Sequence, residues 1–543
     1  MELTDRILVS QVNHVIMQQY PSRRPVGGTL CITSYHLILS ARERGNDELI
    51  IIMHNMIDIV EKKLSNITGG SLSLKCKDFR VVKLDISSTE DLNNVATTLE
   101  SLSSINSVLL MYPFFYRLPP STIEDGWTAY RPESEFTKLT LGDDWRLTYI
   151  NQNFDICPTY PSVLVVPKSM DDDTIILSAK FREGGRFPVL SYRHNVGSVL
   201  MRSSQPLVGS TNKRCKEDER LLNSVLGIGK RGFIIDTRAS NSKSRNGGYE
   251  LQAHYPQWRR LPKPIERHHV LLDSLSKIVE ACIDKSSSMD KWSSRLESSN
   301  WLSHVRDALN CACLTAQCLD QDVSPVLVHG SEGTDSTLVI TSVVQVILNP
   351  DCRTMRGFQA LIEREWLQAG YPFQKRHSRG CFSTTSTGRT KSHGATFLLF
   401  LDCVWQIQNQ FICSFEFSPS LLYLLFEHSY ASEYGTFLGN CEADRDMLEL
   451  PQKTVSLWSY INKIDVLETL LNPLYLPNNK IIWPSVAPMS LILWRELFLR
   501  WTVDLSNERD AQKKIEKIVK KNKELKSKVI QLRKQLTEYS KQT

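Results

Sequence analysis

The chain has 543 residues, 41% of them hydrophobic, which is too long for one ordinary domain and apolar enough for a sizeable core. The net charge of +6 is local, because residues 511–543 hold eleven Lys or Arg against three Glu and leave −2 for the rest. The body has no basic stripe with interleaved aromatic residues, which argues against nucleic-acid binding.

Residues 1–112 have the pattern of a small β-rich domain. Short β-rich runs at residues 29–40, 49–53, 71–76 and 79–86 are separated by turn residues, and Gly69-Gly70 predicts a hairpin turn. A helix should follow, with one apolar face formed by Leu92, Val95, Ala96, Leu99, Leu102 and Ile105. Several strands closed by one helix resemble a pleckstrin-homology module of the GRAM type (PH-GRAM). Such modules bind phosphoinositide headgroups through loop lysines, and the lysines that suit this role here, or else form an ordinary solvated strand edge, are Lys62, Lys63, Lys75 and Lys77.

Residues 113–503 alternate short apolar runs with helical patterns. The runs at residues 163–167, 189–192, 233–236 and 326–328 suit buried strands, and residues 271–282, 301–318 and 395–407 have helical patterns. This alternation predicts an α/β domain whose sheet is covered on both faces, with a binding crevice at the carboxyl ends of the strands. Two polar stretches, residues 238–248 and 376–394, are predicted to be flexible surface loops.

The most informative stretch follows the run at residues 326–328 and precedes a helical pattern. A strand, a loop with two glycines and a helix N-terminus form an anion cradle, because backbone N–H groups and the helix dipole favour a phosphate. The loop consists of Gly330, Ser331, Glu332, Gly333, Thr334, Asp335, Ser336 and Thr337. Phosphate-ester cleavage on such a loop needs a thiolate nucleophile and a cation over the transferring oxygens. Neither a cysteine nor an arginine is present in it.

Residues 328–337 resemble the signature of the myotubularin lipid phosphatases, Val-His-Cys-Ser-Asp-Gly-Trp-Asp-Arg-Thr. Gly330 stands in place of its cysteine and Ser336 in place of its arginine. Further blocks that resemble the family are residues 184–192, 202–206, 235–238, 356–358, 361–367, 400–406 and 435–440. Active members remove the 3-phosphate from phosphatidylinositol 3-phosphate and 3,5-bisphosphate. The resemblance therefore implies a cysteine-phosphatase-like domain of the catalytically inactive branch.

Residues 508–541 are predicted to form a coiled coil of about four heptads. Residues 511–543 contain no Gly or Pro, and the a and d positions are Ile515, Ile518, Asn522, Leu525, Val529, Leu532, Leu536 and Tyr539. β-Branched residues at a with leucine at d favour a parallel pair, and a buried Asn522 fixes its register. The alternative is a solvated charged helix.

The flanking charges of this segment oppose self-pairing. Positions g hold Lys514, Lys521, Lys528 and Gln535, and positions e include Val519, Lys526 and Arg533, so Lys521 would face Lys526 of a second copy and Lys528 would face Arg533. In a parallel homodimer they form four like-charge contacts of roughly 0.2–0.5 kcal/mol each, or about 1–2 kcal/mol in total. A partner helix with acidic e and g positions is therefore favoured.

The first functional hypothesis is an inactive adaptor that binds an active phosphatase through the coil and stimulates or localises it. The resemblance implies partners among active family members, close relatives of myotubularin-related proteins 6, 7 and 8. The alternatives are a phosphoinositide-binding membrane scaffold with weak contact through the PH-GRAM domain, and a lipid phosphatase that uses Ser331, Thr334 or Ser336 as nucleophile. No cofactor is expected.

The cysteines and the chain start bear on localisation. Thirteen scattered cysteines and the lack of a basic, apolar leader at residues 1–6 suit a reducing compartment. Cys311, Cys313 and Cys318 are close in sequence but lack a second ligand pair at zinc spacing, so no metal site is expected. No apolar stretch reaches roughly 18 residues. We expect a cytoplasmic protein that is peripheral on endosomal or endoplasmic-reticulum membranes.

Overall fold

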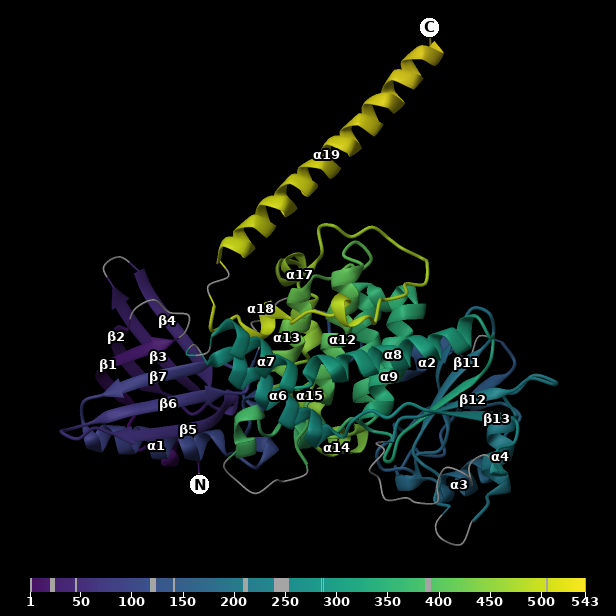
Figure 1. Ribbon diagram of the computed structural model, residues 1–543, viewed down its shortest axis with the longest axis horizontal. Coiled ribbons are helices and arrows are strands. Elements are labelled where there is room, and N and C mark those ends of the chain that lie inside the picture. Colours follow the sequence, from purple (N-terminus) through teal and green to yellow (C-terminus); the bar gives the residue numbers. More distant parts are fainter. Residues whose placement is uncertain are drawn as a thin grey trace.

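A computed structural model describes residues 2–19, 25–43, 46–117, 124–139, 142–208, 213–238, 253–284, 286, 288–385, 392–503 and 506–542. Figure 1 shows three regions in a row: an N-terminal sheet, a central layer of helices, and a second sheet at the far side. A single long helix, α19 (Ser506–Gln542), leaves the body beside the N-terminal sheet. The predicted stretch 238–248 lies outside the described residues except for Arg238.

The N-terminal region is a seven-stranded antiparallel sheet in the order β4-β3-β2-β1-β7-β6-β5. Its strands are β1 (Gln11–Gln19), β2 (Val26–Ile32), β3 (His36–Glu43), β4 (Asn46–Met53), β5 (Ile57–Leu64), β6 (Gly70–Cys76) and β7 (Val81–Ile86). Helix α1 (Thr89–Ser103) closes the sheet with the predicted apolar face, since Leu92, Val95 and Leu99 are fully buried. The predicted run 29–40 is instead two paired strands, because residues 33–35 turn the chain.

The second sheet has five strands in the order β10-β11-β14-β12-β13. They are β10 (Val189–Arg193), β11 (Val199–Ser203), β12 (Gly232–Asp236), β13 (Trp258–Pro262) and β14 (Val326–His329), and β8 (Trp145–Thr148) pairs separately with β9 (Leu164–Pro167). The pairs β11–β14, β14–β12 and β12–β13 are parallel, as an α/β domain requires. Successive side chains of β14 point to opposite faces of the sheet: Val326 and Val328 belong to one hydrophobic core, and Leu327 belongs to the other. Both faces are therefore covered, as predicted.

Helices form the central layer and flank the second sheet (Figure 1). They are α2 (Pro132–Leu139), α3 (Asp172–Phe181), α4 (Lys216–Asn223), α6 (His268–Ile283), α7 (Met289–Ser298), α8 (Trp301–Asp320), α9 (Ser336–Leu348), α10 (Met355–Ile362), α11 (Phe373–His377), α12 (Thr396–Gln410), α13 (Pro419–Tyr430), α14 (Glu442–Met447), α15 (Leu450–Lys453), α16 (Leu457–Ile461), α17 (Ile464–Leu470) and α18 (Arg495–Phe498). Helix α12 is the buried helix expected at residues 395–407, and its Asp402 accepts a hydrogen bond from Trp301 Nε1 at 2.7 Å. None of the helices in the described ranges is long and apolar enough to cross a bilayer.

A carboxylate ties the N-terminal sheet to the central helices. Asp58 of β5 is 3% exposed and accepts hydrogen bonds from the backbone amides of Gly380 at 2.8 Å and of Phe382 and Ser383 at 3.1 Å. The prediction of a flexible loop over residues 376–394 is therefore wrong for residues 376–385. Their polar composition resembles that of a surface loop, but a buried acceptor from a distant strand satisfies their amides.

The four lysines of the N-terminal domain do not form one basic surface. Lys77 is 5% exposed, and burial lowers the pKa of its ammonium to about 8. Lys75 pairs with Glu61 at 2.6 Å, and Lys62 donates to Asn93 at 2.9 Å. Only Lys62 and Lys63 are well exposed, so the four-lysine headgroup site is not supported.

We predict that Asp58→Ala loosens the docked segment 378–385. Each amide that loses its buried acceptor costs roughly 1–3 kcal/mol. Hydrogen exchange of the Gly380, Phe382 and Ser383 amides should therefore accelerate, by about tenfold or more. The matched control is Asp85→Ala, which removes a half-exposed carboxylate of β7 that pairs with Lys83. Unchanged protection in Asp58→Ala would contradict the docking role of this side chain.

Candidate functional site

The glycine-containing loop lies where it was predicted, between β14 and α9. Gly333 has a φ of +73°, and a Cβ there would lie 2.8 Å from the carbonyl oxygen of Ser203, so glycine is needed. The Gly333 carbonyl accepts a hydrogen bond from Arg186 Nη2 at 2.9 Å, and the Ser331 carbonyl accepts one from the Gln205 amide at 3.2 Å. The loop is thus held by β11 and by a buried arginine, with no nucleophile required for its shape.

The position that would carry a nucleophile is crowded by hydroxyl groups. A Cβ at Gly330 would meet Thr337 Oγ1 at 3.0 Å and the Oγ atoms of Ser336 and Thr237 at 3.1 Å. The Ser336 and Thr237 hydroxyls are themselves hydrogen-bonded at 2.8 Å. Ser336 therefore faces into the loop, where it contacts a neutral hydroxyl and supplies no positive charge for a phosphate.

Asp335 is held as a carboxylate by Arg376. Arg376 Nε donates to Oδ1 at 3.0 Å and Nη2 donates to Oδ2 at 2.7 Å, a bidentate pair. Burial raises the pKa of Asp335, but the hydrogen bonds and charge of Arg376 outweigh it and hold that pKa below its usual range. A carboxylate of this kind is a poor proton donor at neutral pH and a weak base.

The remaining hydroxyls of the loop have no good general base. Thr334 Oγ1 donates to Asp335 Oδ2 at 3.3 Å, but that carboxylate is already held by Arg376. His329 is fully buried, and its Nε2 lies 3.7 Å from Asp236 Oδ1 at the end of β12. Burial also lowers the pKa of His329. Neither Asp335 nor His329 is therefore a good base for Ser331, Thr334 or Ser336.

Three residues that shape the loop were not predicted as site residues. Arg186 and Thr237 lie in blocks that resemble the family, so those blocks held a usable signal. Arg376 lies in a stretch predicted to be a flexible loop. No neighbouring residue identifies it as part of the site, because its partner Asp335 is 41 residues away in sequence. The loop residues Gly330 to Thr337 remain a proposed site.

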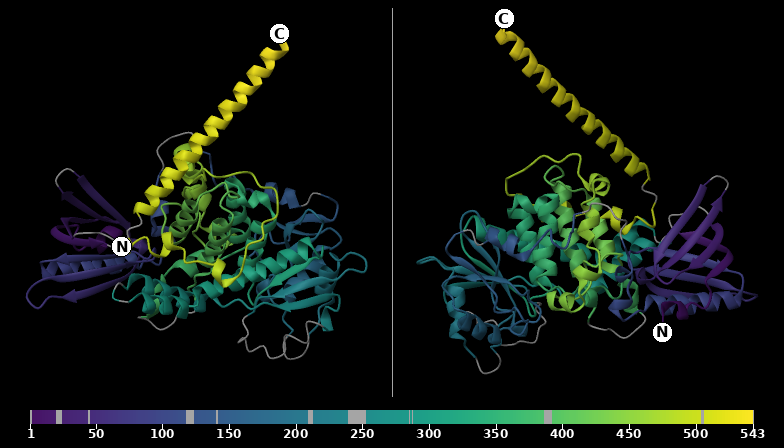
Figure 2. Two further views of the ribbon diagram at one scale, coloured as in Figure 1. Left: turned by 45° about the horizontal axis from the view of Figure 1, so that its top comes forward. Right: turned by 180° about the vertical axis from the view of Figure 1, so that it is seen from behind.

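The predicted coil residues lie on α19, a helix of 37 residues that projects from the body in each view of Figures 1 and 2. The predicted a and d side chains are exposed to 49% at Ile515, 61% at Ile518, 50% at Leu525, 48% at Val529 and 57% at Leu532. The side chains of Leu536 and Tyr539 lie outside the description. The helix is therefore present with an uncovered apolar stripe, while its pairing stays a prediction.

Comparison with known proteins agrees with this architecture. The family model of the myotubularin-like phosphatase domain matches residues 111–446, and that of the GRAM domain of MTMR6-9 matches residues 9–103. Human myotubularin-related protein 9 is 50% identical, over 99% of this chain and 98% of its own length. A bovine protein named myotubularin-related protein 9-like is 46% identical over 96% of both chains.

A relative named as an enzyme is more distant. Human phosphatidylinositol-3,5-bisphosphate 3-phosphatase MTMR8 is 33% identical, over 98% of this chain and 76% of its own length. The two domain matches and the full-length similarity agree with the β-rich N-terminal domain and the α/β core described above. The chain therefore belongs to the myotubularin family.

Proposed function

We propose that the chain is a catalytically inactive pseudophosphatase that binds an active myotubularin phosphoinositide 3-phosphatase through α19 and stimulates or localises it. The observation that carries the proposal is the loop at residues 330–337, which keeps the shape of a phosphate cradle without a nucleophile or a free cation. Two arginines of the described structure contact this loop: Arg376 is paired with Asp335, and Arg186 donates to the Gly333 carbonyl oxygen.

The C-terminal helix supports the binding part of the proposal. Its apolar stripe is about half exposed, and a 37-residue helix with such a stripe buries it best against another helix. Like charges at the e and g positions oppose a homodimer, as argued above. We therefore propose a partner helix with acidic flanking positions, from an active relative close to myotubularin-related proteins 6, 7 and 8.

The site of action follows from the same proposal. The GRAM domain suggests membrane association, and the exposed lysines Lys62 and Lys63 allow at most a weak phosphoinositide contact. The adaptor would thus act peripherally on endomembranes, placed there by its partner. Co-purification of active family members by the full chain, and its loss after deletion of residues 508–543, tests the proposal directly.

We predict no turnover of 3-phosphorylated inositides by the purified chain. Neither Gly330 nor Ser336 supplies the required chemistry, and Gly330→Cys alone should also stay inactive, because Ser336 still stands where the arginine over the transferring oxygens is required. Phosphate release from phosphatidylinositol 3-phosphate vesicles is the measurement. Turnover that survives Gly330→Ala but is lost in Asp335→Ala would identify a different nucleophile and overturn the proposal.

We predict that the loop binds a soluble inositol 3-phosphate headgroup only weakly. Loss of a bidentate arginine removes two charge-assisted hydrogen bonds of roughly 1.5–3 kcal/mol each, on the order of 10²–10⁴ in affinity. Titration calorimetry should show tighter binding in Ser336→Arg than in the native chain. The control Ser298→Arg adds the same charge on the exposed surface of α7. Micromolar binding by the native chain, unchanged in Ser336→Arg, would contradict this.

We predict that the basic e and g positions select the partner. Replacing Lys521, Lys526, Lys528 and Arg533 with Glu turns four attractions into repulsions, roughly 2–4 kcal/mol, and should weaken the heterodimer about 30- to 1000-fold. Leu525→Pro should abolish it by breaking the helix. Binding of the full chain to its co-purified partner, measured at low salt, gives the comparison.

A matched control makes the same change in net charge at positions away from the interface between the two helices. Lys513, Lys517, Lys520 and Lys534 occupy the outward c and f positions, and their replacement with Glu should leave the heterodimer intact. The native preference should fade above about 0.5 M salt as screening shortens the range of the charges. Equal weakening by both sets of substitutions would show that the net charge of the helix, and not the charges at positions e and g, controls pairing.

A further inference from the structure

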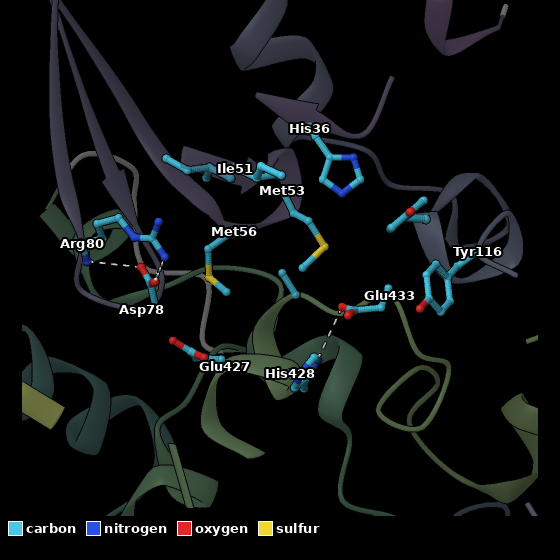
Figure 3. A pocket seen from close by; sticks show the side chains of 13 residues that line it. His36, Ile51, Met53, Met56, Asp78, Arg80, Tyr116, Glu427, His428 and Glu433 are labelled. Carbon is cyan, nitrogen blue, oxygen red and sulfur yellow. Dashed lines mark hydrogen bonds and ion pairs between the residues drawn. The ribbon is translucent and has the colours of Figure 1, made fainter. Parts of the chain in front are cut away.

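A cavity lies between the N-terminal sheet and the central helices, away from the loop discussed above. Its volume is about 330 Å³, within the usual range of small-ligand sites. Strands β3 and β4 contribute His36, Ile51 and Met53, the hinge after α1 contributes Tyr112 and Tyr116, and the residues after α13 contribute Glu433. Figure 3 shows Glu433 and Tyr116 on one side of this cavity and Arg80 and Asp78 on the other.

The charges on the Arg80 side are compensated. Arg80 Nη2 lies 2.9 Å from Asp78 Oδ2, and Arg500 Nη1 lies 2.9 Å from Glu427 Oε1. The guanidinium of Arg80 also stacks 4.3 Å from the ring centre of Trp501. These groups form a closed network and leave little charge for a ligand.

Glu433 on the opposite side has no compensating cation. No lysine or arginine of the described ranges lies within ion-pair distance of its carboxylate, and His428 Nδ1 lies 3.8 Å from it. That nitrogen is 2.8 Å from Ser432 Oγ, and burial lowers the pKa of His428 to about 4, so the ring is neutral at pH 7. Burial raises the pKa of Glu433, and no Lys or Arg of the described ranges pairs with its carboxylate, so this group faces the cavity without a cationic partner.

Aromatic rings surround that charge. The ring centres of Tyr112 and Tyr116 are 5.7 Å apart, His36 packs edge-on to Tyr112 at 4.7 Å, and Tyr116 packs against Tyr434 at 5.5 Å. Burial, and then the charge of Glu433, raise the pKa of Tyr112, and both residues line the same cavity. Aromatic faces with a nearby carboxylate attract cations, and most strongly where water is partly excluded.

We propose that this interdomain cavity binds an organic cation, an alkylammonium or alkylguanidinium group. The cation would lie against Glu433, Tyr112 and Tyr116, and its alkyl part would lie along Ile51, Met53 and Met56. Methionine side chains adapt to such chains because they are flexible and polarizable. The ligand class is opposite in charge to a phosphoinositide headgroup, so this site is independent of the proposed adaptor function.

Binding of n-butylguanidinium to the full chain by titration calorimetry tests the inference, with neutral n-pentanol as the apolar comparison. We expect measurable binding of the cation, with n-pentanol at least tenfold weaker. Glu433→Gln should weaken cation binding at least tenfold, while Glu468→Gln, which removes an exposed carboxylate of α17, should leave it unchanged. Tyr116→Leu should weaken it about three- to thirtyfold and Tyr116→Phe should retain it, because the ring face is kept.

The same titration with a capped Gly-Arg-Gly peptide identifies the source of the cation. Tighter binding of the peptide assigns the site to an arginine side chain of a protein, and exclusion of the peptide assigns it to a free small molecule. Equal binding of n-pentanol and n-butylguanidinium, no binding of the cation, or binding unaffected by both Glu433→Gln and Tyr116→Leu in folded protein would overturn the inference.

Discussion

The bidentate pair between Arg376 and Asp335 connects the parts of this molecule. Asp335 is the N-cap residue of α9, within the loop that follows β14, and Arg376 comes from α11 in the helical layer. A few residues further along, the same segment donates its backbone amides to Asp58 of the N-terminal sheet. One stretch of chain, residues 376–383, thus joins the loop, the helices and the N-terminal domain. Loss of either carboxylate would leave buried donors without acceptors, which is costly in a packed interior.

The same pair contributes to the shape of the loop, in which Gly330 and Ser336 occupy the positions of the cysteine and arginine of the family signature. A phosphate-binding loop needs positive charge directed at the ligand, but of the two arginines that contact this loop in the described structure, Arg376 is paired with Asp335 and Arg186 donates to backbone carbonyls. Glycine at 333 and the hydrogen bond from Arg186 fix the backbone independently of any nucleophile. The stability of the strand, loop and helix therefore does not depend on Cys or Arg side chains, so their absence is tolerated by the fold.

Two groups in the described structure lack a partner within the chain: an apolar helix face that no other apolar surface covers, and a carboxylate with no paired Lys or Arg. The apolar stripe of α19 is about half exposed from Ile515 to Leu532, and no Lys or Arg of the described ranges pairs with the Glu433 carboxylate. The two lie near the same end of the molecule, because Trp501, shortly before α19, donates to the Asp78 carbonyl beside the cavity at 2.9 Å. Both are surfaces for which an external partner lowers the free energy, one by hydrophobic burial and one by charge compensation.

The sequence by itself determined what local periodicity encodes. The apolar face of α1, the buried runs that became β9, β10, β12 and β14, the loop before α9 and the heptads of α19 are all readable, because burial repeats along a strand or helix at a fixed period. Strands β1, β5, β8, β11 and β13 were missed, since weak alternation does not separate them from loops. Only the tertiary structure decided which distant groups come together: Arg376 pairs with Asp335, Asp58 with Gly380, and Glu433 lines one cavity with Tyr112 and Tyr116. It also buried Lys77, which the sequence had suggested as a headgroup ligand. Pairing across tens or hundreds of residues depends on how elements pack, and a local pattern carries no information about the partner.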